Sequence, residues 1–336
     1  MTREAATPLN TAFGLLSSIN GAAPGMQPSR NPTRNSFYGC LAASALGDAI
    51  GELAFRLPDE SRLRDYIQNA DELRYTDDTA MALGLAESII ACDGTVDAQH
   101  LGETFRKNYD REPWRGYGPG PPSIFRQVAQ SEIGYLEAAQ SLFGGEGSMG
   151  NGAAMRIAPA GVFFAGSDER YEMAALSARV THAHRLGQDG AAVLAAAISL
   201  AATTDPNENF PAGDFATRLS GIARTDEFAT AMERVQKLLQ ENAVRDQAAA
   251  RLGTDVLIHR SVPYAIFSFL RNSKSFVDAL MDAIMVEGDR DTIGAMTGAV
   301  SGAHLGIDAI PHEWLEKLEN RQYIEELAAE LVVHAT

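Results

Sequence analysis

The chain has 336 residues, of which 28 are basic and 44 are acidic, so its formal net charge is -16. This length is enough to bury a substantial core in one large domain or two small ones. The acidic balance argues against a nucleic-acid partner and against charge-driven binding to an anionic membrane, because both need clustered Lys and Arg.

Residues 1–35 are rich in Pro, Ser, Asn and Gly and are interpreted as an extension outside the core, with a short amphipathic helix expected over residues 11–20. Whether this extension binds a partner or is a disordered tail stays open. From residue 36 onward apolar residues recur at spacings of three and four, the helical period. The expected helices cover residues 37–53, 78–91, 98–109, 122–130, 133–141, 169–181, 187–203, 213–223, 226–251, 260–271, 275–286, 291–305 and 312–333.

Alternating runs of β-branched residues are scarce, so we expect almost no strand and one compact all-α domain over residues 36–336. No run of 18 or more apolar residues predicts a membrane span. The two cysteines, Cys40 and Cys92, lie in apolar helical stretches and are expected to be free thiols, which suits a cytoplasmic protein.

Two short clusters of oxygen-bearing side chains each precede an apolar, Ala-rich helical stretch. The first is Thr76-Asp77-Asp78, and the second, more than 200 residues later, is Asp289-Arg290-Asp291-Thr292. Carboxylates gathered at two helix N-termini are costly unless a positive charge lies between them, and hard cations such as Mg2+ take carboxylate, hydroxyl and water oxygens. The two clusters therefore predict a two-metal site for a phosphate-bearing or polyhydroxyl substrate.

Helix capping is the ordinary alternative for both clusters. Thr and Asp are favoured N-caps, and acidic residues suit the positive end of a helix. For the first cluster taken alone, capping is at least as good an explanation. The match between the clusters, each with two Asp and one Thr, favours a binuclear site, as do the small residues Gly288, Gly294 and Ala295 that permit close approach.

Two glycine-rich loops could hold a diphosphate through their backbone amides. One runs from Gly116 to Gly120, and the other from Gly144 to Gly152. Taken alone, the second is better explained as an ordinary loop, and the first is either a rigid turn or a second phosphate-binding loop. Neither carries the Gly-Lys-Ser/Thr of a Walker loop, and no strand precedes the second loop, so a dinucleotide-binding fold is not indicated.

Two single residues are further candidates for the site. Asp48 is a carboxylate inside an apolar helix and needs a partner, so we expect it to support the site. His182 in Thr181-His182-Ala183-His184 could bind a metal or a ribose hydroxyl, although such a pair of histidines is more often a helix-end or surface group.

Taken in order, these motifs resemble the ADP-ribosylglycohydrolases, the family that includes dinitrogenase-reductase-activating glycohydrolase and the ADP-ribosyl-acceptor hydrolases. The resemblance covers residues 36 to about 310 and implies an all-α orthogonal helical bundle with glycosidase activity. Six blocks carry it: Gly39-Cys40-Leu41-Ala42 through Leu46-Gly47-Asp48, Tyr75 to Met81, Arg115-Gly116-Tyr117-Gly118, Gly150 to Arg156, Thr181-His182 with Leu186-Gly187, and Gly288 to Ile293.

The resemblance also implies two Mg2+ ions, with Mn2+ as a substitute. They would orient the ribose of an ADP-ribosylated protein, while Asp77 or Asp289 acts as the catalytic carboxylate that positions or deprotonates water. The implied metal ligands are Thr76, Asp77, Asp78, Asp289, Asp291 and Thr292. The residues expected to form the ADP-ribose site are Asp48, Gly116, Gly118, Gly120, Ser148, Met149, Gly150, Asn151 and His182.

One departure bears on the substrate. Serine-directed members carry a Glu four residues after the glycine that matches Gly51, whereas this chain has Phe55 there and Glu52 on a different helical face. This favours arginine-linked over serine-linked ADP-ribose. Similar bacterial proteins serve as immunity factors against ADP-ribosyltransferase toxins, and residues 1–35 would suit contact with such a toxin.

Two other classes of protein fit these residues less well than this hydrolase. A non-catalytic ADP-ribose-binding or structural relative need not keep four Asp and two Thr ligands, which argues against it. Another two-metal hydrolase, such as a phosphodiesterase, usually has His among its ligands, and neither cluster contains one.

Overall fold

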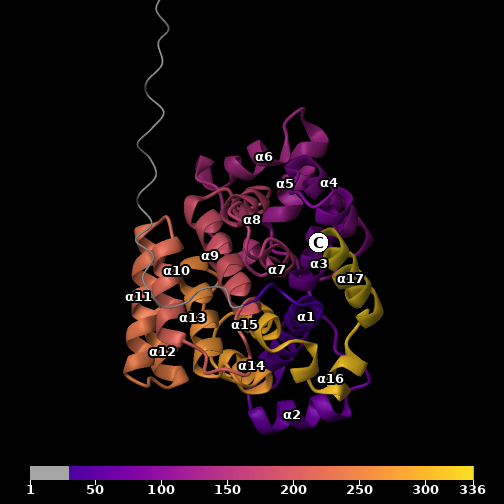
Figure 1. Ribbon diagram of the computed structural model, residues 1–336. Helices are drawn as coiled ribbons and strands as arrows, with labels where there is room; N and C mark the ends of the chain where they lie inside the picture. The colour runs from indigo at the N-terminus through magenta and orange to yellow at the C-terminus, as the bar shows by residue number, and fades with distance from the viewer. Residues whose placement is uncertain (1–29, 336) are drawn as a thin grey trace, which may run out of the picture.

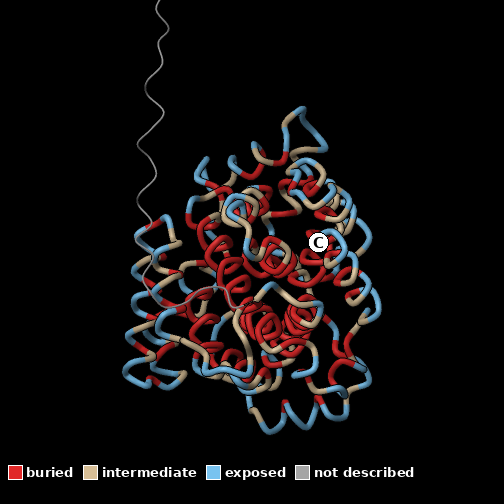
Figure 2. The backbone as a smooth tube through the Cα atoms, in the orientation of Figure 1, coloured by how far each residue is buried: buried red, intermediate tan, exposed pale blue. Residues whose placement is uncertain are grey.

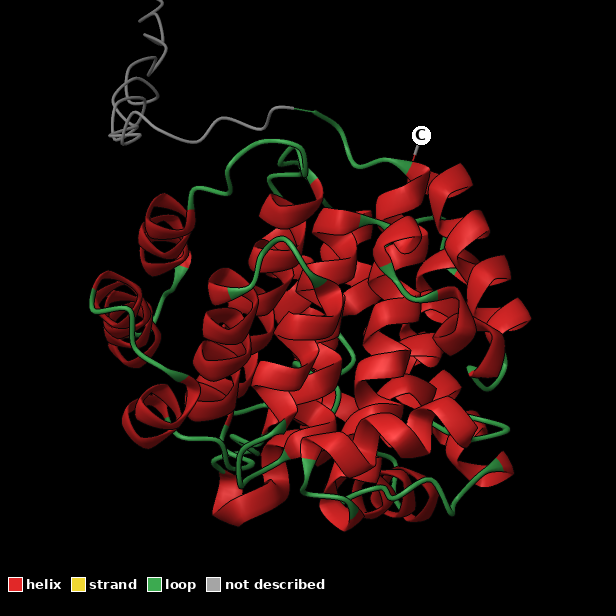
Figure 3. Cartoon of the chain, turned by 90° about the horizontal axis from the view of Figure 1, so that it is seen from below, coloured by secondary structure: helices red, strands yellow, loops and turns green. Residues whose placement is uncertain are grey.

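The computed structural model describes residues 30–335 and is built from helices joined by short loops (Figure 1, Figure 3). Within the described range there is no strand, only two isolated β-bridges, which confirms the all-α prediction. The α-helices are α1 Arg34–Arg56, α2 Glu60–Asn69, α3 Asp77–Ala91, α4 Ala98–Arg111, α5 Gly120–Gln130, α6 Tyr135–Ser141, α7 Ala158–Phe163, α8 Arg170–Arg179, α9 Arg185–Ala202, α10 Ala212–Ile222, α11 Asp226–Gln240, α12 Arg245–Leu252, α13 Ile258–Arg271, α14 Phe276–Ile284, α15 Arg290–Leu305, α16 His312–Lys317 and α17 Arg321–Ala335.

Helices α1 and α15 form the central pair, and their backbones touch because small residues face one another along both. A Cβ added to Gly47 would lie 2.1 Å from the carbonyl oxygen of Gly294, and one added to Gly298 would lie 2.1 Å from that of Ala43. Positions 39, 43, 47 and 51 thus meet positions 302, 298, 294 and 290 in reverse order. The two helices therefore run antiparallel at a separation that larger side chains would prevent.

This antiparallel pairing decides where the site lies. It brings the C-terminal half of α1, with Asp48 and Gly51, beside the first residues of α15, where Asp289 and Asp291 lie. Helix α3 packs against both and begins at Asp77. Three helices that are distant in sequence thereby bring their acidic residues to one place.

The other helices enclose this centre. Helices α10 to α13 lie on one flank, α4 to α6 at one end, and α2 with α16 at the opposite end (Figure 1). Buried segments gather in the middle and exposed segments lie at the periphery (Figure 2). One cluster of buried apolar side chains runs from Phe37 to Leu331, so the described residues share a single core.

Several predicted helix boundaries were wrong. Residues 226–251 and 312–333 are not single helices, because Asn242 and Asn320 adopt positive φ of 51° and 53° and break each into two. Helices α2 and α7 were not predicted. The predicted domain boundary between residues 35 and 36 falls inside α1, which starts at Arg34. The short helix predicted over residues 11–20 lies outside the described residues.

A search of the described residues for a membrane-spanning helix found none with the necessary length and apolar character.

Candidate active site

Asp48 of α1 takes the place of an N-cap for α3. The side chain is fully buried, with 0% exposure, and accepts hydrogen bonds from the backbone N–H groups of Thr76 and Thr79, at 3.0 Å each to Oδ2. The two Thr hydroxyls also donate to it, at 2.8 and 2.6 Å. Because a carboxylate from another helix satisfies these donors, the start of α3 does not need its own side chains as caps.

The carboxylates of the first cluster are therefore free for another purpose. Thr76 is the N-cap residue of α3, yet its side chain makes no capping hydrogen bond. Asp78 is only 2% exposed, and its Oδ2 atom has no hydrogen-bond partner among the described residues. A buried, unpaired carboxylate oxygen is costly, which indicates that this position is built to meet a positively charged group.

The second cluster shows the same absence of capping. Asp289 is the N-cap residue of α15 but makes no side-chain capping bond; instead its Oδ2 accepts from the side-chain amide of Asn151 at 2.6 Å. Asp291 accepts from the backbone N–H of Thr292 at 2.8 Å. Thr292 is buried. Helix capping thus explains neither cluster.

Burial and mutual repulsion perturb all of these carboxyl groups. Burial, followed by the charges of Asp48 and Asp289, raises the pKa of Asp77 to about 7. Burial, Asp289 and Asp48 raise the pKa of Asp291 to about 8. The pKa of Asp78 lies well above its usual range, because of burial first and then Asp48 and Asp291. Each group disfavours the charged form of its neighbours, and a cation between them would relieve this.

The two clusters face one cavity of about 520 Å³. Thr76 and Asp77 of the first cluster and Asp291 of the second line it, together with Gly116. The lining also includes charged and aromatic side chains, namely Glu52, Arg56, Tyr66, Glu72, Arg74, Tyr75, Trp114, Arg115 and Glu319. The cavity is large enough for part of a nucleotide-sized ligand, and it opens directly on the carboxylates.

The loop from Ser148 to Asn151 is joined to the second cluster. Besides the bond from Asn151 to Asp289, the backbone N–H of Asn151 donates to the carbonyl of Val256 at 2.9 Å, and the N–H of Ile258 donates to the carbonyl of Met149 at 3.1 Å. The hydroxyl of Ser148 accepts from the N–H of Gly150 at 3.1 Å. This loop is therefore held beside the carboxylates from two sides.

His182 lies behind the same loop. Its ring is 7% exposed, and Cβ atoms added to Gly150 and Gly152 would lie 3.5 and 2.9 Å from its Nε2 atom. The Nδ1 atom is 2.7 Å from the hydroxyl of Thr181. Burial lowers the pKa of His182 to about 3, so the ring is neutral. The geometry suits support of the glycine loop.

The other glycine loop is joined to the site less closely. Gly116 has a positive φ of 94°, and a Cβ there would lie 3.7 Å from Oδ1 of Asp77. Gly118 has nothing within 4 Å of its Cβ position, and Gly120 is the first residue of α5. Gly116 is therefore beside the first cluster, whereas no carboxylate lies within 4 Å of the Cβ position of Gly118 or Gly120 among residues 30–335.

The predicted metal site can be tested against these side chains. No three carboxylate, imidazole or thiolate groups of the described chain converge into a closed metal cage. Three features fit a different arrangement. Oδ2 of Asp78 is unpaired, the side chain of Thr76 makes no capping bond, and Asp291 lines the same cavity as Thr76. Mg2+ is usually held by one or two carboxylates, with water and substrate oxygens completing its octahedron. The residues present fit that mode of binding.

Several residues of the site were not predicted. Thr79 shares Asp48 with Thr76, and Arg156 is fully buried, donating to the carbonyl of Gly152 at 3.0 Å. Both residues lie within the sequence motifs described above, so the sequence could have identified them as site residues. Arg115 was predicted only as a motif residue, and Glu319, which lines the same cavity, had no signal at all.

Comparisons with known proteins agree with the fold. The family described as ADP-ribosylglycohydrolase matches residues 29–336. ADP-ribosylhydrolase ARH3 of Homo sapiens is 31% identical over 335 residues, covering 88% of this chain and 92% of the relative. ADP-ribosylarginine hydrolase Tri1 of Pseudomonas putida (strain GB-1) is 24% identical, covering 87% of this chain and 76% of the relative.

A solved structure of an ADP-ribosylglycohydrolase-related protein complex has the same fold, with a TM-score of 0.68 at 24% identity, covering 90% of this chain and 99% of the other. The fold, the family match and the relatives lead to one conclusion. The chain belongs to the ADP-ribosylglycohydrolase family, and it is a glycosidase that acts on ADP-ribose.

Proposed function

We propose that this chain is a Mg2+-dependent hydrolase that removes ADP-ribose from the side chains of modified proteins, with arginine-linked ADP-ribose preferred. The observation that carries the proposal is the cavity itself. Asp77 and Asp291 line it together with further carboxylates and with the exposed rings of Tyr66 and Trp114. The two aspartates suit a metal and the ribose hydroxyls, and the exposed rings and carboxylates suit the modified side chain.

The residues divide the chemistry between them. When bound, the metal ions supply positive charge that orients the ribose and stabilises charge in the transition state. Asp77 lines the cavity directly, whereas one carboxylate oxygen of Asp289 is already engaged by Asn151. Asp77 is therefore the better placed of the two to position the attacking water and to accept its proton.

The preference for arginine follows from the cavity lining. Trp114 is 71% exposed and Tyr66 is 47% exposed, and both line the cavity together with Glu52. Glu52 has no ion-pair partner within residues 30–335. Aromatic faces and an unpaired carboxylate attract a planar guanidinium through cation–π contact and hydrogen bonding. A serine side chain offers neither a charge nor a plane to such a surface.

A serine-linked substrate is the second candidate, because of where Glu52 lies. Glu52, expected on a different helical face from the position of Phe55, lines the cavity that contains Asp77 and Asp291. The site thus holds a carboxylate that Phe55 does not supply. The same side chain could serve either substrate, so the choice belongs to experiment.

The decisive measurement compares two peptides that carry ADP-ribose on arginine or on serine, with and without EDTA. We expect Mg2+-dependent release of ADP-ribose from the arginine-linked peptide and at least tenfold slower release from the serine-linked peptide, a difference of about 1.4 kcal/mol in activation free energy. Asp291→Ala is the inactive control. Faster release from serine would favour the second candidate, and activity that survives EDTA would contradict the metal site. The cytoplasmic location and the toxin-immunity role stay predictions.

A further inference from the structure

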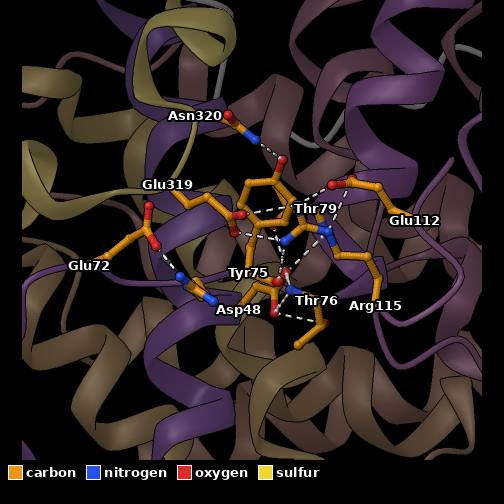
Figure 4. Close-up of polar contacts among 10 residues, drawn as sticks. Asp48, Glu72, Tyr75, Thr76, Thr79, Glu112, Arg115, Glu319 and Asn320 are labelled. Carbon is orange, nitrogen blue, oxygen red and sulfur yellow. Dashed lines mark hydrogen bonds and ion pairs between the residues drawn. The ribbon is translucent and has the colours of Figure 1, made fainter.

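The segment before the first ligand cluster is held by one buried arginine (Figure 4). Nη1 of Arg115 donates to the carbonyl oxygen of Tyr75 at 3.0 Å, and the guanidinium lies over the ring of Tyr75, 4.3 Å from its centroid. The carbonyl of Arg115 in turn accepts from the backbone N–H of Asp77 at 2.8 Å. Arg115 thus contacts the residues on both sides of Thr76.

Arg115 is itself oriented by two carboxylates. Glu319 accepts from Nη1 at 2.7 Å and from Nη2 at 3.0 Å, a bidentate pair, while Glu112 accepts from Nε at 3.2 Å and from Nη2 at 3.0 Å. The side chain of Arg115 is 6% exposed and that of Glu319 is 17% exposed. A bidentate charge-assisted pair in such a place fixes geometry far better than an exposed ion pair does.

The turn that carries Glu319 is attached to the same segment by its backbone. The N–H of Leu73 donates to the carbonyl of Lys317 at 2.7 Å, and the N–H of Glu319 donates to the carbonyl of Leu73 at 3.0 Å. The side-chain amide of Asn320 donates to the hydroxyl of Tyr75 at 2.8 Å. Arg115 and Glu319, which are 204 positions apart along the chain, are therefore joined with Leu73 and Tyr75 into one connected unit.

We propose that Arg115 and Glu319 are positioning residues that set the placement of Thr76 and Asp77 for metal and substrate. The inference rests on the proposed function for the role of Asp77, and on the contacts above for the rest. Glu319 lines the same cavity as Asp77, so the pair lies at the site and does not merely anchor helix α17. Partners that orient ligand residues typically contribute ten- to a hundredfold to metal affinity or activity.

Glu319→Gln tests the proposal, since glutamine keeps the size but loses the charge and one of the two acceptor oxygens. We expect the Mg2+ concentration for half-maximal activity to rise about tenfold or more. The rise in melting temperature that Mg2+ causes should need correspondingly more Mg2+, which provides a readout independent of catalysis. Arg115→Lys should behave likewise, because an ammonium cannot make the bidentate pair. Glu112→Gln, at the more exposed partner, should show a smaller shift in the same direction.

Glu325→Gln is the matched control. It removes the Arg321–Glu325 ion pair of 2.7 Å in helix α17, which follows the turn that carries Glu319, and should leave both Mg2+ responses unchanged. The proposal is overturned if Glu319→Gln melts at a lower temperature but keeps the wild-type Mg2+ response, since Glu319 would then only stabilise the fold. A wild-type protein that hydrolyses its substrate without any Mg2+ response would contradict the proposed function instead.

Discussion

At the scale of single residues, the site depends on one carboxylate that does the work of a helix cap. Asp48 accepts the donors at the start of α3, and this leaves Asp77 and Asp78 free to face the cavity and the second cluster. In the sequence alone, a cluster of metal ligands and a capped helix start consist of the same residue types. Only the position of Asp48 on a neighbouring helix distinguishes them, and the sequence indicated its need for a partner without indicating which one.

Asp78→Asn tests this arrangement of charges. Asp78 is buried with an unpaired oxygen among like charges, so replacing it should raise the melting temperature measured in EDTA. The same change should abolish most of the Mg2+-induced stabilisation and lower turnover by about a hundredfold or more. Differential scanning calorimetry with and without Mg2+, together with the peptide assay, measures all three effects.

Asp189→Asn is the control for burial alone. Asp189 is 1% exposed but accepts from the hydroxyls of Tyr171 and Thr225 and from backbone N–H groups. Its replacement should destabilise the protein by about 1–3 kcal/mol with or without Mg2+, because satisfied donors lose their acceptor. An Asp78→Asn variant that behaved in the same way would show that Asp78 is a structural residue.

At the scale of elements, the helical period predicted most helices but not where two of them break. Apolar spacing continues across Asn242 and Asn320, so the pattern reads as one helix, while both residues adopt the left-handed conformation that Asn tolerates better than most. The central pair was foreseen only in part. Gly294 was interpreted as permitting close approach, but the matching row on α1 became evident only once the two helices were side by side.

Gly298→Ala tests the packing of that pair. A methyl group at this position would lie 2.1 Å from the carbonyl oxygen of Ala43, a backbone atom that cannot move without shifting α1. We expect a loss of about 3 kcal/mol or more in the free energy of unfolding, at the upper end for overpacked cores. Gly221→Ala in α10 is the matched control, because nothing lies within 4 Å of its Cβ position. It should be neutral or stabilising by up to about 1 kcal/mol in urea denaturation. Equal effects of the two substitutions would contradict the close packing.

At the scale of the whole molecule, the site is assembled from segments that the sequence motifs identify and from one that they do not. The motifs around Asp48, Asp78 and Asp291 can be recognised in the sequence, because binding a metal or a phosphate requires particular residue types. Glu319 belongs to no recognisable motif. This single glutamate in a turn becomes part of the site only because the fold brings it against Arg115, 204 positions earlier in the chain. Contacts of this kind are a property of the tertiary fold and have no local signal.

The predicted extension can be separated from the domain by two truncations. Deleting residues 1–29 should leave hydrolysis of a small ADP-ribosylated peptide within about twofold of wild type, since every candidate site residue lies within residues 30–335. Deleting residues 1–35 should instead lower stability by about 1–3 kcal/mol. That deletion removes the Thr33 cap of α1 and the amide of Asn35, which accepts from the N–H of Ile307 at 3.0 Å and donates to Asp308 at 3.1 Å.

Peptide hydrolysis and thermal melting of both truncated proteins measure these effects. Loss of small-substrate activity in the shorter deletion would show that the extension belongs to the catalytic domain. If the extension binds an ADP-ribosyltransferase, as the immunity prediction requires, the shorter deletion should lose that binding and keep its hydrolase activity. Retained binding would place any such interface on the helical domain, because the two functions would then not be separable at residue 29.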